Sequence, residues 1–114
     1  MGEGYVIGLD YGTSYSNLTS NFNDYFTDLN QFAVVGGFDN SPAGDRKPLS
    51  AWRTETGKDL NSVSGDPVFV NNQTDLHISV SGSPAANIGQ PIAGVSVDLD
   101  GEPGSRATTP DIGA

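Results

Sequence analysis

The chain has no cysteine and a single histidine among its 114 residues. Without cysteine it forms no disulfide framework and no thiolate metal site, and it has no thiol nucleophile. A serine nucleophile would have to use His77 as its base, and no Gly-x-Ser-x-Gly elbow accompanies that histidine. The sequence therefore gives little support to an enzyme that works through a Cys or Ser nucleophile.

Positive charge is also scarce. Five Lys and Arg residues stand against fourteen Asp and Glu residues, for a formal net charge of −9. Such a chain repels a phosphate backbone instead of releasing its counterions, so we expect no nucleic-acid partner. No run approaches the roughly 18–20 apolar residues that span a bilayer, so we expect no membrane insertion. Residues 1–3 resemble no signal segment, and any secretion signal is expected to lie outside this chain.

Glycine and proline are abundant, with fifteen and seven residues. Both residues favour turns, so a chain of this length and composition is predicted to form one β-rich domain with short strands. The predicted strands are the stretches rich in β-branched and aromatic residues: 5–9, 11–18, 32–35, 66–70 and 75–80.

One short helix is predicted at residues 50–56. Ser50 is placed to serve as N-cap, and Gly57 stands where a left-handed residue ends a helix. Because so short a helix is stable only when packed, Leu49 and Trp52 are expected to hold it against the body of the protein.

Two stretches lack a regular period. The polar residues 38–47 are predicted to form an exposed loop. Residues 82–114 place isolated apolar side chains between Gly, Pro and Asp, so we expect them to be extended and ordered only by lying against the folded part.

Residues 6–17 (VIGLDYGTSYSN) resemble the first phosphate loop of the actin and heat-shock-chaperone ATPase superfamily. The resemblance implies that Gly12 lets the backbone approach phosphates, that Thr13 and Ser14 donate hydrogen bonds, and that Asp10 organises a metal's water shell. A plain strand–turn–strand explains the same residues, and no second phosphate loop follows them.

A second resemblance covers most of the chain after residue 18. Its landmarks, in order, are NDY at 23–25, LSAW at 49–52, TGKD at 56–59, NSVSGDPVFV at 61–70, DLH at 75–77, GSPA at 82–85, DLDG at 98–101 and PDIGA at 110–114. In this order they look like the C-terminal end of secreted bacterial right-handed parallel β-helix proteins, which are related in shape to pectate lyases.

This resemblance implies an all-β fold, a parallel β-helix (solenoid) fragment of about three to four coils with one short helix and a C-terminal capping segment. Residues 1–81 would be the terminal coils, with a loop and the helix at about 38–57. Residues 82–114 would be the cap. The side chains expected inside the solenoid are Val6, Ile7, Leu9, Leu18, Phe22, Phe32, Val34, Val68, Val70, Leu76, Ile78 and Val80.

The same resemblance sets the expected partners and location. The chain would pack on neighbouring β-helix coils of its parent protein, in a secreted or cell-surface bacterial setting. Its first coil, residues 5–18, would lack a cover, and exposed strand edges invite association. A homo-oligomer through this end is therefore expected.

Three aromatic residues are candidate carbohydrate-binding residues. Tyr11 and Tyr15 are four apart, which puts both on one face of a strand, and Trp52 is either a sugar-stacking platform or a packing anchor. Asp98 and Asp100, followed by Gly101, are candidate calcium ligands. Their alternative role is to cap backbone N–H groups or to pair with Arg106.

The expected function is that of a non-catalytic structural or binding module with a carbohydrate-contacting surface. Its acids are scattered next to turn residues, where capping explains them, and calcium is the sole candidate cofactor. One alternative is the C-terminal part of a polysaccharide lyase or hydrolase whose catalytic residues lie upstream. Another is a nucleotide-binding fragment that uses the loop at 6–17.

Overall fold

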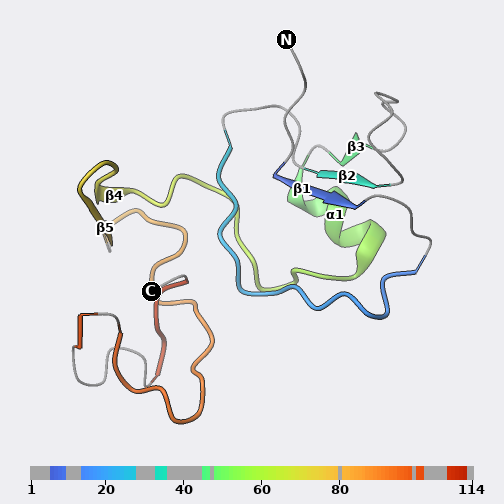
Figure 1. Cartoon of the computed structure of the whole chain (residues 1–114). Coiled ribbons are helices and arrows are strands. Elements are labelled where there is room, and N and C mark those ends of the chain that lie inside the picture. Colours follow the sequence, from blue (N-terminus) through green and yellow to red (C-terminus); the bar gives the residue numbers. More distant parts are fainter. Residues whose placement is uncertain are drawn as a thin grey trace.

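The structure, a computed structural model, describes residues 6–9, 14–27, 33–35, 45–46, 48–79, 81–98, 100–101 and 108–112. Its elements are β1 (Ile7–Leu9), β2 (Ala33–Val35), β3 (Asp45–Arg46), α1 (Leu49–Thr56), β4 (Phe69–Asn71) and β5 (Asp75–Ile78). β1 pairs in parallel with β2, and β3 pairs antiparallel on the other side of β2. β4 and β5 form a separate antiparallel hairpin. Figure 1 shows α1 beside the three-stranded sheet and the hairpin away from both.

The predicted parallel β-helix is wrong. A solenoid needs the strands of successive coils to stack in parallel. Across the described residues, parallel pairing is limited to β1 with β2 and to an isolated bridge between Asp24 and Val63. The hairpin replaces the expected coil because the Asn71 side chain accepts hydrogen bonds from the backbone of Gln73 (2.9 Å) and Thr74 (3.2 Å), which closes a tight turn.

The predicted helix is confirmed as α1, and so is its end. Gly57 has a left-handed φ of 67°, and its N–H bonds to the carbonyl of Arg53. Its predicted start is wrong, because the N-cap is Pro48, in an extended conformation and without a side-chain hydrogen bond. Ser50 lies inside the first turn, where its carbonyl accepts a hydrogen bond from the Thr54 hydroxyl at 3.0 Å.

Some of the predicted strands are found in the structure and others are not. β1 and β2 lie inside the predicted stretches 5–9 and 32–35, and β5 begins at the predicted residue 75. In the described part of 11–18 a turn replaces the strand, with the Leu18 N–H bonded to the Tyr15 carbonyl at 3.1 Å. β3 lies within the predicted loop 38–47, whose other residues are outside the described part.

The main core lies where α1 meets the sheet. Leu49, Trp52 and Thr56 form the buried stripe of the helix, at the spacing of one helical face. Leu49 and Trp52 pack with Ala33 of β2, which confirms that these two residues hold the helix in place. Partly buried residues complete this core: Ile7, Leu9, Tyr15, Leu18 and Tyr25.

Residues 82–98, 100–101 and 108–112 form no strand or helix, and hydrogen bonds join residues 85–89 to residues 110–112. The Ile112 N–H bonds to the Ala85 carbonyl at 2.9 Å, and both residues are buried. The Gly89 N–H bonds to the Pro110 carbonyl at 2.6 Å. A Cβ at Gly89 would lie 2.7 Å from that Pro110 oxygen, so this approach of two backbones requires glycine.

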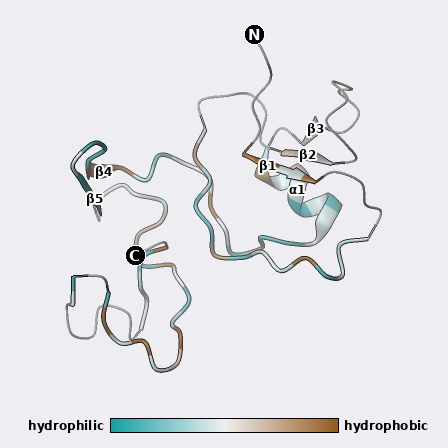
Figure 2. Ribbon diagram, viewed as in Figure 1, coloured by the Kyte–Doolittle hydropathy of each residue, from teal (hydrophilic) through white to brown (hydrophobic). Residues whose placement is uncertain are grey.

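Several side chains expected inside the solenoid face solvent instead. Val68, Val70 and Leu76 are 36%, 62% and 63% exposed, because the hairpin packs against no sheet in the described part of the chain. Figure 2 shows apolar residues on the hairpin and along the irregular C-terminal segment. None of the helices formed by the described residues is long and apolar enough to cross a membrane.

Candidate functional site

Two polar clusters stand out, and the first surrounds the Asp59 carboxylate just after α1. The chain reverses there through two left-handed residues, Gly57 and Asp59, with φ of 67° and 57°. This reversal carries the Asp59 side chain back beneath the helix. Asp59 is 1% exposed, although an isolated buried carboxylate is costly.

Five side-chain donors converge on this carboxylate. Oδ2 accepts one hydrogen bond, from the indole Nε1 of Trp52 at 2.8 Å. Oδ1 accepts the others, and its donors are Ser62 (2.6 Å), Ser20 (2.9 Å), Asn23 (3.0 Å) and Tyr25 (3.1 Å). We call Asp59 and these five residues the Asp59 joint, because it fastens residues 20–25 to α1 and to residues 59–62.

Backbone contacts reinforce the Asp59 joint. The Arg53 guanidinium donates to the Asp59 carbonyl at 2.8 Å and also to the Ser62 carbonyl. The Asp59 N–H donates to the Ser20 carbonyl at 2.9 Å. A positive side chain of α1 thus contacts the loop that carries the buried negative one.

The surroundings of the Asp59 carboxylate favour its ionised form. Burial opposes ionisation of Asp59, but the hydrogen bonds from Ser62, Trp52, Asn23 and Ser20 outweigh it and hold its pKa below the ordinary value. Asp59 is therefore ionised at neutral pH, and all its donors belong to the protein. This arrangement suits a structural tie, since a catalytic acid or base must exchange protons with a substrate.

Asp24 has the opposite environment. Both of its carboxylate oxygens are buried, and the described residues form no well-aligned hydrogen bond with either oxygen. Burial raises the pKa of Asp24, as does the nearby Asp66 charge, while the backbone N–H groups of Gly65 and Tyr25 oppose that rise. Its carboxylate is thus a local source of instability.

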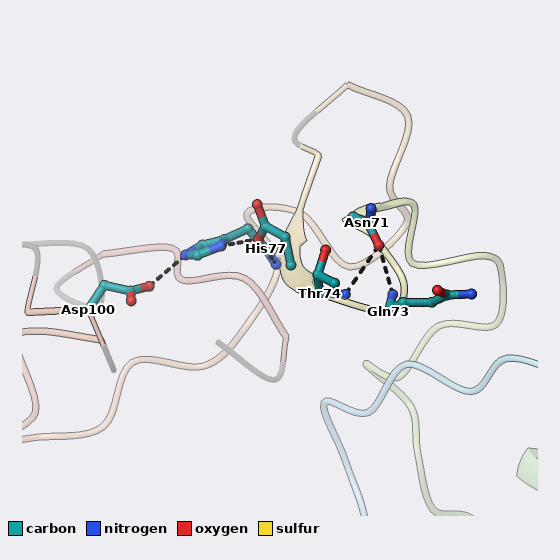
Figure 3. A network of polar contacts seen from close by, with 6 residues as sticks. Asn71, Gln73, Thr74, His77 and Asp100 are labelled. Carbon is teal, nitrogen blue, oxygen red and sulfur yellow. Dashed lines mark hydrogen bonds and ion pairs between the residues drawn. The ribbon is translucent and has the colours of Figure 1, made fainter.

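The second cluster is centred on the hairpin. The His77 ring lies between two carboxylates, with Nδ1 against Asp75 and Nε2 at 2.6 Å from Asp100 (Figure 3). Asp75 and His77 are on β5, whereas Asp100 lies in a turn 23 residues further along the chain. We call these three residues the His77 clasp, because they fasten the hairpin to the C-terminal segment.

The charges of the His77 clasp determine what it can do. Hydrogen bonds to Asp75 and Asp100 raise the pKa of His77 from 6.5 to about 9. The ring is therefore protonated at neutral pH, and an imidazolium has no lone pair for accepting a proton or binding a metal. The hydrogen bonds from His77 also lower the pKa of Asp75. The cluster is thus suited to an ion pair.

The His77 clasp is expected to open at alkaline pH. Because the folded-state pKa lies above 6.5, its contribution to stability is complete below pH 6.5 and is lost as the pH rises through about 9. His77 is the only histidine, so its ring signals in proton NMR report this titration directly. We expect a midpoint near 9, and a midpoint displaced toward 6.5 in Asp100→Asn. A wild-type midpoint at the ordinary value would contradict the contact.

The two candidate carbohydrate-binding residues that the structure describes do not form an exposed platform. Tyr11 lies outside the described residues. Tyr15 packs against the core and donates its hydroxyl to Glu55 at 2.9 Å. Trp52 is 1% exposed, so neither face of its indole is open to a sugar, and the structure gives carbohydrate binding no support.

The candidate calcium residues are engaged with the protein. An Asp98 carboxylate oxygen accepts the Asp100 backbone N–H at 3.0 Å, which is the capping role considered as the alternative. Asp100 turns its side chain to His77. No group of three or more His, Cys, Asp or Glu side chains among the described residues could hold a metal ion. Asp10, Gly12 and Thr13 of the phosphate-loop resemblance lie outside the described part.

One shallow cavity of about 250 Å³ lies where residues 21–22 meet the C-terminal segment. Its lining includes Phe22, Ile92, Asp111 and Ile112. This volume is below the range of about 300–1,000 Å³ that holds most small ligands. Comparison with protein-family models, curated proteins and solved structures found no match.

Proposed function

We propose that the chain is a non-catalytic module that binds a protein partner through the β4–β5 hairpin. One observation carries the proposal. The hairpin exposes Val68, Phe69, Val70 and Leu76, which are 36–63% accessible to solvent. A contiguous patch of exposed apolar side chains is a typical feature of a protein–protein contact surface.

The architecture of the hairpin supports a docking role. A two-stranded hairpin is marginally stable by itself and gains stability from a third strand or a packed layer. Figure 1 shows the hairpin away from the sheet and α1, and β4 and β5 form a sheet of two strands within the described part of the chain. The His77 clasp anchors the hairpin, so its apolar side chains stay presented.

The two polar clusters support a non-catalytic role. Asp59 is buried and ionised among donors of the protein, and the His77 ring is protonated between two carboxylates. Neither group is arranged to take a proton from a substrate near neutral pH.

A matched pair of leucine variants tests the proposal. Leu76 on the hairpin and Leu60 near the Asp59 joint are 63% and 68% exposed. Replacing either leucine with glutamine therefore removes the same apolar side chain at a similar exposure. We expect Leu76→Gln to lower the fluorescence of the apolar dye Nile red bound to the folded chain several-fold. Leu60→Gln should leave it unchanged.

The near-UV circular dichroism of Trp52 serves as the check that both variants stay folded. Equal dye binding by the two variants would show that the hairpin is not an accessible apolar surface. A wild-type chain that binds no dye would contradict the proposal more directly.

A further inference from the structure

We infer that the hairpin's partner is an extended, basic strand of another protein, which adds to the free edge of β4. This inference rests on the proposed function and specifies the chemistry of the partner. Strand addition supplies both the backbone hydrogen bonds and the apolar neighbours that an isolated hairpin lacks.

The structure distinguishes the two edges of the hairpin. All three residues of β4 are exposed, whereas both ends of β5 are half-buried. β5 is also fastened by His77 to the turn that contains Asp100. β4 pairs with β5 on one side and with no other strand in the described residues, so its outer edge is the available one.

The surrounding charge selects a basic partner. Asp66 precedes β4, and Asp75 is paired across the hairpin with Asn71 at the end of β4. The nearby positive group, His77, is already held between Asp75 and Asp100. With a net charge of −9 for the chain, a strand carrying Lys or Arg between β-branched residues complements this edge.

The same charge disfavours a second copy of the chain. Pairing two β4 edges would bring together two chains that each carry a net charge of −9, with an Asp66 beside each edge. The free edge is also short, because the Val68 N–H already donates to the Asp66 side chain at 2.9 Å. A short edge provides few hydrogen bonds, so we expect micromolar or weaker binding that weakens further with salt.

Labelled peptides test the inference by fluorescence anisotropy. The probe alternates lysine with valine, and its counterparts alternate glutamate with valine or carry N-methyl groups on one edge of the lysine–valine strand. We expect the first peptide to bind at least about tenfold more tightly than either counterpart. Amide hydrogen exchange should show new protection at Phe69–Asn71 when it binds.

Two valine variants separate strand addition from general attraction to an acidic protein. Val70 is on β4 and is 62% exposed, and Val95 is off the hairpin and is 42% exposed. Lysine adds the same charge at each. We expect Val70→Lys to weaken binding about tenfold, as at a central contact, and Val95→Lys to change it little.

Equal weakening by both variants, or equal binding of the N-methylated peptide, would overturn the inference. The N-methylated peptide keeps the test valid even if Val70→Lys distorts the hairpin, because it leaves the protein unaltered. Nile red binding at the hairpin without binding of the basic peptide would overturn this inference and leave the docking function standing. Absence of dye binding would remove both.

Discussion

Replacing Asp59 with asparagine is expected to lower the free energy of unfolding by about 3–5 kcal/mol, as breaking a buried charge network does. The amide has one acceptor oxygen, whereas the carboxylate accepts Trp52 on Oδ2 and four donors on Oδ1. Whichever way it rotates, its NH₂ group faces buried donors. Such a loss is a large part of the roughly 5–15 kcal/mol that stabilises a typical domain.

Urea unfolding followed by Trp52 fluorescence measures this change, because the indole belongs to the same joint. Asp66→Asn is the matched control. It makes the same substitution at an exposed aspartate, and the asparagine oxygen can still accept the Val68 N–H. We expect the control to lie within about 0.5 kcal/mol of the wild type. Similar losses of unfolding free energy in the two variants would show that the buried Asp59 carboxylate does not stabilise this region more than an exposed aspartate does.

Low pH should destabilise the fold through the same Asp59 carboxylate. Because the folded-state pKa of Asp59 lies below its ordinary value, its stabilising contribution is present above that ordinary value and is lost as the pH falls through the folded pKa. Asp24 acts in the opposite sense, since its pKa is raised and protonation relieves an unpaired buried charge. Protonation of Asp59 is therefore expected to destabilise the fold as the pH falls, and protonation of Asp24 is expected to offset part of that loss.

Several local elements of this fold, such as β1, β2 and the end of α1, were predictable from sequence, and their arrangement was not. The end of α1 follows from one residue, Gly57, whose left-handed conformation is a property of glycine itself. The start depends on which of Pro48 and Ser50 adopts the extended conformation, a choice that the tertiary packing of Leu49 decides. The landmarks of the β-helix resemblance match in order along the chain, but that order does not show whether two strands are parallel or antiparallel. The turn at Asn71 makes β4 and β5 an antiparallel hairpin.

The same distinction applies to the polar clusters. Asp59 was expected to cap a corner, like the other scattered acids, yet Ser20 and Asn23 reach it from 39 and 36 residues away. His77 and Asp75 lie two residues apart within the predicted strand 75–80, which places both on one face, whereas Asp100 joins them from 23 residues away. Periodicity reports which side chains share a face, and it is silent on distant segments that meet there. In the sequence Asp59 stands two residues after Gly57, and that spacing does not distinguish it from the other acids beside turn residues.

Trp52→Phe is expected to lower the free energy of unfolding by about 2–4 kcal/mol while keeping an aromatic ring in the core. Most of this loss comes from Oδ2 of Asp59, which would keep its charge without the one side-chain donor that the described residues give it. The pKa of Asp59 should rise in this variant because the Trp52 hydrogen bond is one of those that lower it. Acid unfolding of Trp52→Phe should therefore begin at higher pH than in the wild type.

Tyr15→Phe is the matched control, because it also removes one aromatic donor to a carboxylate. The Tyr15 hydroxyl donates to Glu55 at 2.9 Å, but that pair is exposed, so water can replace the lost donor. We expect a loss below about 1 kcal/mol and no change in the onset of acid unfolding. Far-UV circular dichroism follows both variants without relying on the indole. If acid unfolding begins at the same raised pH in both variants, Asp59 does not depend on the Trp52 donor. If the onset rises only in Trp52→Phe, burial gives this hydrogen bond its effect.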